Sequence, residues 1–128
     1  MKTYQELSKI IVRISMSLVF LYFGYQQITS PESWMGIVPD IVLLMGISAK
    51  NIVILNSILE LSLGTLLLLG LYTRAVSLVL SIHLFLISFN FGFEPVGVRD
   101  FGLAVTTLSI FFSGQDNFSL DNKLKKKL

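Results

Sequence analysis

Long apolar runs, separated by short polar segments, divide the chain into four stretches of membrane-spanning length. The hydrocarbon core of a bilayer requires about 20 mainly apolar residues per helix. Four windows meet or approach this length, at about residues 10–28, 51–72, 75–93 and 97–113. The fourth window is the weakest, because its uncharged part crosses only if the residues just before it also enter the membrane edge. The pattern predicts an all-α integral membrane protein, a four-helix transmembrane bundle that forms a single domain over residues 1–128.

The segments between these runs carry residues that end or begin helices. Helix breakers interrupt the connection between the first two spans, at Pro31, Pro39 and Gly46. Trp34 and the apolar run 41–45 in this connection favour a short interfacial segment. Ser48 fits the N-cap of the second helix. The very short link at 71–74 predicts that the second and third spans form an antiparallel helical hairpin.

The composition excludes a water-soluble monomer and several kinds of site. The chain is 53% hydrophobic and 14% charged, whereas soluble domains carry about 25% charged residues. It contains no cysteine, which excludes disulfides, thiolate-held clusters and thiol nucleophiles, and its one histidine excludes a three-histidine metal site from a single chain. We therefore expect no metal site and no covalently bound cofactor. Redox chemistry would require a non-covalent cofactor, a partner chain or oligomerisation.

The basic residues indicate an orientation. Four of the ten lie in the last six positions, which favours a membrane surface over nucleic acid as the partner. With four spans, one side of the membrane carries Lys2, Lys9, Arg13, Arg74 and the C-terminal lysines, whereas the other carries Lys50 and Arg99. The positive-inside rule then predicts a multi-pass protein of the cell (inner or plasma) membrane with both termini in the cytoplasm. In this interpretation Arg13 and the C-terminal lysines are anchors at the cytoplasmic interface.

Polar side chains within the spans gather from mid-depth towards the outer side. Placing such a group in lipid costs about 2.5–3.5 kcal/mol even on the most lenient scale, so each is a candidate functional residue. Glu60 falls at the centre of the second span and His83 near the centre of the third. We predict one small polar pocket, open to the outer leaflet, whose ligand-binding candidates are Gln27, Asn56, Glu60, His83, Asn90, Arg99 and Asp100.

Helical spacing supports this pocket. Asn56 and Glu60 lie four residues apart and His83 and Asn90 lie seven apart, so the members of each pair share a helix face. On the first span a stripe of mostly small or polar residues recurs at intervals of four and three, and it consists of Arg13, Ser17, Phe20, Gly24 and Gln27. Small and polar residues mark the packed side of a membrane helix, so the stripe is expected to face the bundle interior.

Each candidate also has a purely structural interpretation. Glu60 could be a protonated acid that makes one interhelical hydrogen bond, and His83 a core histidine bonded to Glu60 or to a hydroxyl. Arg99 and Asp100 could form an ion pair that caps the fourth helix. Adjacent helical residues point about 100° apart, however, so at least one of the two is expected to reach another helix, with Glu60 as the partner considered for Arg99. The sequence assigns no catalytic residue and leaves open whether the protein is an enzyme.

Several motifs in order resemble those of a known family. An arginine opens the first span, FGYQQI ends it, and a loop with proline and tryptophan follows; the second span carries a central glutamate and then runs into GLYTR. The chain ends with RDFGLA, a glycine and SLD. Over nearly its whole length the sequence resembles the DoxX family of small four-helix membrane proteins. Many members carry lysine where Gln27 stands. With glutamine at this position, Arg99 is the only strong hydrogen-bond donor for an anion in the predicted pocket.

The resemblance implies a four-helix transmembrane bundle and a place near membrane redox chemistry. The family takes its name from a subunit of an archaeal thiosulfate:quinone oxidoreductase, and some members associate with redox complexes. The first hypothesis is therefore a membrane subunit of a quinone-linked redox complex, with redox proteins or further copies of the chain as partners. Its pocket would hold a quinone or a lipid through Glu60 and His83. The alternative is a non-enzymatic structural, lipid-binding or small-solute-binding membrane protein. A transporter or channel is disfavoured because the cytoplasmic half offers no polar pathway.

Overall fold

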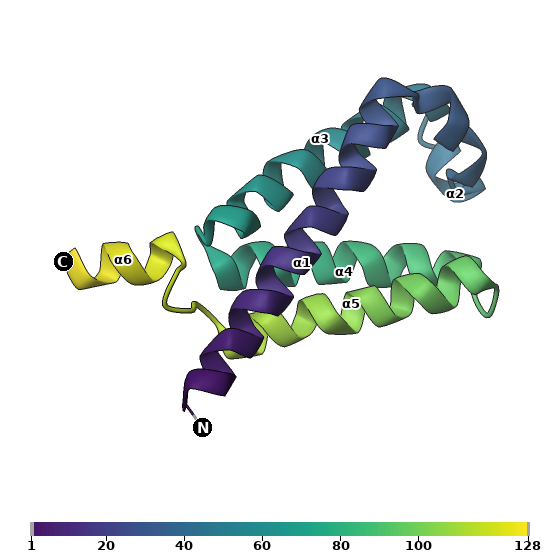
Figure 1. The fold of residues 1–128 in the computed structure, drawn as a ribbon. Helices are drawn as coiled ribbons and strands as arrows, with labels where there is room; N and C mark the ends of the chain where they lie inside the picture. Colours follow the sequence, from purple (N-terminus) through teal and green to yellow (C-terminus); the bar gives the residue numbers. More distant parts are fainter. Residues whose placement is uncertain (1, 128) are drawn as a thin grey trace.

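The four apolar runs form four long helices, connected by short helical segments (Figure 1). The computed structural model describes residues 2–127, and side chains up to residue 124. Every regular element in this range is helical, and the elements in chain order are α1 (Lys2–Thr29), η1 (Pro31–Ile37), α2 (Asp40–Leu43), α3 (Ala49–Leu69), α4 (Thr73–Phe91), α5 (Pro95–Ser113) and α6 (Leu120–Lys127). Because α1, α3, α4 and α5 are long and apolar enough to cross a bilayer, the predicted fold class is confirmed, and the protein is a multi-pass membrane protein.

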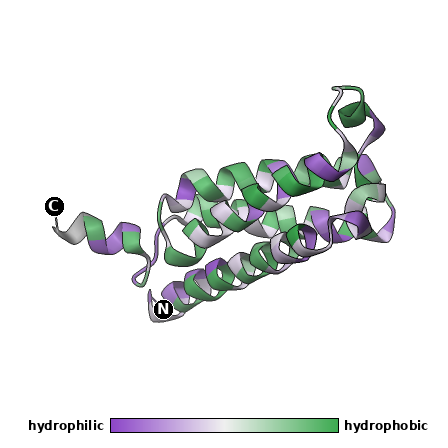
Figure 2. Cartoon of the chain, turned by 90° about the horizontal axis from the view of Figure 1, so that it is seen from above, coloured by the Kyte–Doolittle hydropathy of each residue, from purple (hydrophilic) through white to green (hydrophobic). Residues whose placement is uncertain are grey.

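The outer surface of the bundle is apolar, as a lipid-facing surface must be. No more than 33% of the most apolar window of any long helix is buried within the chain, and many large hydrophobic side chains of these helices are exposed. Hydrophobic residues dominate the middle of the bundle, whereas hydrophilic residues are concentrated at its ends and connections (Figure 2). A bilayer supplies the environment in which this surface is stable.

Local sequence signals place the helix ends. The Ser48 hydroxyl accepts a hydrogen bond from the backbone N–H of Asn51 at 3.3 Å, which confirms the predicted N-cap of α3. The same helix ends in a Schellman motif, in which Gly70 adopts φ 75° and the N–H groups of Gly70 and Leu71 bond the carbonyls of the last turn. Helix α1 begins at Lys2 rather than near residue 10, because its first polar turns extend beyond the apolar span.

The long helices associate in two pairs, α1 with α3 and α4 with α5. Helices α3 and α4 are neighbours in the chain, yet they contact each other far less than either contacts its pair partner, so the predicted hairpin of these two helices is only loosely packed. The pairs cross at an angle, meet near the α3–α4 turn and separate towards the opposite end (Figure 1). All five residues of the predicted stripe on α1 are buried, which confirms that this face points inward.

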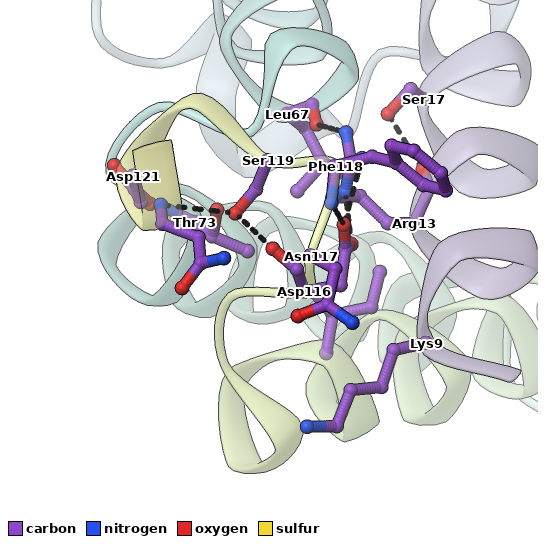
Figure 3. Close-up of polar contacts among 12 residues, drawn as sticks. Lys9, Arg13, Ser17, Leu67, Thr73, Asp116, Asn117, Phe118, Ser119 and Asp121 are labelled. Atoms are coloured by element: carbon purple, nitrogen blue, oxygen red, sulfur yellow. Dashed lines mark hydrogen bonds and ion pairs between the residues drawn. The ribbon is translucent and has the colours of Figure 1, made fainter. Parts of the chain in front are cut away.

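Arg13 and Asp116 form a buried ion pair at the end of the bundle where the chain begins (Figure 3). The Arg13 Nε and Nη2 atoms lie 2.6 Å and 3.2 Å from the two Asp116 carboxylate oxygens. Its Nη1 donates to the backbone carbonyls of Leu67 and Leu68 in the last turn of α3, where the Leu67 carbonyl also accepts from the Gly70 N–H. Arg13 is only 2% exposed, so its interpretation as an interfacial anchor is wrong: it joins α1, the end of α3 and the segment after α5.

The segment after α5 is also fixed to the α3–α4 turn (Figure 3). The Asp121 carboxylate accepts hydrogen bonds from the backbone N–H groups of Tyr72 and Thr73 at 2.8 Å and 2.7 Å, and thereby caps the start of α4. Its own N–H donates to the Gly70 carbonyl at 2.9 Å. A Cβ at Gly70 would lie 2.4 Å from the Cβ of Ser119, so only glycine permits this close approach. Helix α6 projects from this end of the bundle (Figure 1).

Candidate functional site

A cavity of about 450 Å³ lies at the opposite end, where the two helix pairs separate. The later halves of α1 and α4 and the earlier halves of α3 and α5 form its walls, and η1 and α2 contribute residues from the first connection. The structure places every one of the predicted ligand-binding candidates on its lining, namely Gln27, Asn56, Glu60, His83, Asn90, Arg99 and Asp100. Their common location is a structural finding, whereas their role in binding stays a prediction.

Most of the cavity wall is apolar. It includes Phe20 from α1, Val53 from α3, Leu84 from α4 and Leu103 from α5. The volume falls in the range of about 300–1,000 Å³ that is typical of small-molecule sites, which combine apolar walls with a few well-placed polar groups. The cavity therefore has the size and chemistry to accept an amphiphilic molecule.

Polar contacts run across three helices on one side of the cavity. The Asn56 side-chain amide donates to Gln27 Oε1 at 2.6 Å and to Glu60 Oε1 at 3.3 Å. Glu60 Oε1 lies 3.7 Å from His83 Nε2, a distance beyond a hydrogen bond. These contacts connect α1, α3 and α4 at the point where the helix pairs begin to separate.

Two buried polar atoms of this group have no hydrogen-bond partner among the described residues: Glu60 Oε2 and His83 Nε2. Glu60 is 4% exposed. A buried polar group without a partner costs about 1–3 kcal/mol, so such atoms require an explanation. The interpretation of His83 as a core histidine bonded to Glu60 or to a hydroxyl does not hold at Nε2. Both side chains line the cavity, so a group bound there is a candidate partner for these atoms.

Arg99 and Asp100 lie at the outer part of the lining. Arg99 Nη2 is 3.2 Å from Asp100 Oδ1, and its guanidinium carbon lies 5.5 Å from the centre of the Phe23 ring. Arg99 thus reaches another helix, as expected of at least one of these neighbours, but its contact there is Phe23 of α1, and no hydrogen bond or ion pair joins it to Glu60 among the described residues. The long arginine side chain folds back on Asp100 and onto an aromatic ring of α1. Asn90 is exposed at the end of α4.

The sequence did not predict that the first connection would contribute to the cavity. Trp34 of η1 contacts Phe23 with ring centroids 5.8 Å apart, and both residues line the cavity. Val42 of α2 lines it as well. Tryptophan and valine in an interfacial segment are equally consistent with contact to lipid headgroups, so composition alone does not reveal this contribution. Periodicity gives no better signal, because α2 is only one turn long.

A comparison with models of known protein families identifies the family of this chain. A family model described as DoxX matches residues 8–92, which is more than half of the chain. The chain belongs to the DoxX family. The DoxX match extends from α1 to the end of α4 and so includes Gln27, Asn56, Glu60, His83 and Asn90; the resemblance noted in α5 and the following segment lies beyond it. Searches of curated proteins and of solved structures found no match to the chain.

The site contains no evident metal-binding cluster. Within the part of the chain that the structure describes, no three histidine, cysteine, aspartate or glutamate side chains are grouped so that they could hold a metal ion. The polar side chains of the cavity are instead hydrogen-bonding groups: two carboxyl groups, an imidazole, a guanidinium and three amides. Their chemistry suits a ligand that carries carbonyl or hydroxyl groups.

Proposed function

We propose that this DoxX protein binds a quinone-like or lipid-like amphiphile in the cavity and serves as a membrane subunit of a quinone-linked redox complex. One observation carries the proposal: Glu60 Oε2 and His83 Nε2 are buried without a hydrogen-bond partner among the described residues, and both side chains line a mainly apolar cavity. A polar head bonded to both atoms would satisfy them, and the apolar walls would accommodate the remainder of the molecule.

The two side chains suit a quinone head. A quinone carbonyl accepts a hydrogen bond, which a neutral histidine N–H or a protonated glutamic acid can donate. A quinol hydroxyl donates one, which the glutamate oxygen or the unprotonated histidine nitrogen can accept. When bound, a quinone supplies redox chemistry that couples electrons to protons. The role of this chain in that chemistry is to hold the head and to exchange protons at Glu60 and His83, because carboxyl and imidazole groups can serve as proton donors and acceptors.

The electrons would come from a partner. The chain has no cysteine and a single histidine, so it lacks the ligands that hold an iron–sulfur cluster or a bis-histidine haem. A redox partner protein, or a complex that includes further copies of this chain, completes the proposed activity.

A non-enzymatic lipid-binding role is the second candidate. The apolar character of the cavity wall favours it, because a single acyl chain would fill such a space without any redox reaction. In that case Arg99 at the outer lining would contact the headgroup. The two candidates share the same cavity and differ in the head that reaches Glu60 and His83.

The proposed orientation places both termini in the cytoplasm. The basic residues of both chain ends and Arg74 in the first turn of α4 support it, through the positive-inside rule. The cavity then lies in the outer half of the membrane. Because the chain has no cysteine, single cysteines in the α3–α4 turn and in η1 can be tested for reaction with a membrane-impermeant thiol reagent in whole cells.

Quinone titration tests the proposed function. Trp34 is the only tryptophan and lines the cavity, so a decyl-benzoquinone bound there should quench its fluorescence to a saturable extent. We expect Glu60→Gln and His83→Ala to abolish the saturable component. Thr106→Ala is the matched control, because Thr106 is exposed on α5 and bonds only its own helix. Equal saturable quenching in the natural protein and in the three variants would refute the proposal. If Glu60→Gln and His83→Ala lose thermal stability but keep unchanged quenching, Glu60 and His83 act only in packing.

A further inference from the structure

One cavity-lining side chain also reaches the outside of the bundle. Leu86 on α4 lines the cavity, yet it is 67% exposed. It lies three residues after His83 and four before Asn90, so the three residues share one face of α4. The face that carries the deep imidazole therefore continues to the outer surface of the molecule.

This face borders a loosely packed side of the bundle. Helices α3 and α4 contact each other far less than the helices within each pair, as do α1 and α5, although only the short segment 70–72 connects α3 to α4. The α1–α5 side is bridged by the contact of Arg99 with Phe23, and Trp34 of η1 packs on the same ring. The α3–α4 side has the Glu60–His83 contact at mid-depth. Among the described residues, no hydrogen bond or ion pair joins these helices nearer the outer end, so the outer end of the cavity is bridged only on the α1–α5 side.

The exposed wall residue lies at a depth that the hydrocarbon core occupies. Leu86 stands five residues before the end of α4, which corresponds to about 7.5 Å along the axis at about 1.5 Å per residue. Its exposed neighbours on α4, Ile82 and Phe89, are also large and apolar. An opening surrounded by such side chains would admit a hydrocarbon chain and would exclude a hydrated solute.

We propose that α3 and α4 form a lateral portal at Leu86, through which the ligand enters from the bilayer and in which its apolar tail remains. This inference rests on the proposed function and specifies its ligand class: a bilayer-dissolved amphiphile with a polar head and a hydrocarbon tail. The head reaches Glu60 and His83, and the tail passes Leu86 into the lipid.

Thiol labelling tests the portal, because the natural chain has no cysteine. Leu86→Cys and Val79→Cys are compared in phosphatidylcholine liposomes after reaction with a bulky adamantyl maleimide. Val79 is the matched control: it precedes Leu86 by seven residues on the same face of α4, is also exposed, and does not line the cavity. The readout is saturable quenching of Trp34 by decyl-benzoquinone dissolved in the bilayer.

We expect the label at position 86 to abolish saturable quenching and the label at position 79 to leave it unchanged. Leu86→Ala widens the portal without any label, so decyl-benzoquinone should quench the Trp34 fluorescence of this variant faster than that of the natural protein. Benzoquinone without a tail should quench less at equal concentration, since it lacks the part that remains in the portal.

Two outcomes would overturn the portal, and they are distinguishable. Suppose that Trp34 is quenched equally in the labelled Leu86→Cys and Val79→Cys proteins, while Glu60→Gln abolishes the quenching. The ligand then enters the cavity by another route, and only the portal is wrong. If the natural protein shows no saturable quenching by the tailed quinone, the proposed function fails and the portal fails with it. Equal monodispersity of both cysteine variants before labelling excludes misfolding as the cause of a loss.

Discussion

Removal of the Asp116 carboxylate should destabilise the protein far more than removal of an exposed carboxylate. In Asp116→Ala the Arg13 guanidinium stays buried against the carbonyls of Leu67 and Leu68, but it loses both oxygens that neutralise its charge. The backbone N–H of Phe118 loses its acceptor as well, because Asp116 Oδ1 accepts from it at 2.9 Å.

The magnitude follows from burial. The side chains of Arg13 and Asp116 are 3% and 1% exposed, so water cannot replace the lost partner. Removal of one member of a buried pair costs about 3–5 kcal/mol, because the remaining charge is left uncompensated. If Arg13→Met is added to Asp116→Ala, the double variant should lose less stability than the sum of the single variants, since no buried charge then remains.

Unfolding in a mild detergent measures this difference. Glu32→Ala is the control, because Glu32 also pairs with a cation, Lys50 at 3.3 Å, but both side chains are more than half exposed. We expect no measurable change for this control. Should Asp116→Ala unfold at the same denaturant concentration and temperature as Glu32→Ala, the ion pair would not be buried as described, and the attachment of the C-terminal segment to α1 would be wrong.

Three further substitutions test other parts of the structure. Gly70→Ala should lower the thermal midpoint, because a Cβ would meet Ser119 at 2.4 Å and because alanine disfavours φ 75°; an unchanged midpoint would contradict the close approach. Asp121→Ala should lower the free energy of unfolding by about 0.5–2 kcal/mol through loss of the α4 cap, with Asn122→Ala as a neighbouring control. Asn56→Ala should weaken decyl-benzoquinone binding less than Glu60→Gln does, since it removes a hydrogen bond to Glu60 Oε1 but keeps the Glu60 carboxyl group, including Oε2. A larger loss than in Glu60→Gln would indicate that Asn56 itself contacts the ligand.

Helical periodicity explains why the sequence predicts much of the cavity. Residues four or seven apart share a face wherever a helix is continuous, and Asn56, Glu60, His83 and Asn90 lie within continuous helices. Placing polar atoms in lipid is costly, so these faces must turn inward or towards a cavity. The depth of each residue follows from its position in a span, which brings together groups from different helices.

The same rules cannot predict the partner of Arg13 or the pairing of the helices. Asp116 lies in the segment after α5, where no helical period relates it to a span. Lipid is as apolar as the side chains that face it, so hydropathy does not reveal that α3 packs on α1 in preference to α4. The contact of Arg99 with Asp100 depends on the flexible arginine side chain, whose direction the Cα–Cβ vector does not determine.

Native mass spectrometry of the protein, purified in a mild detergent, tests the central claim most directly. The natural protein should retain a bound molecule with the mass of a quinone or a lipid, because Glu60 and His83 line a cavity of suitable size and each has a buried atom without a partner among the described residues. Glu60→Gln should lose that molecule, and Thr106→Ala should keep it. A natural protein that carries no bound molecule, or equal retention by Glu60→Gln and Thr106→Ala, would contradict the proposed binding site.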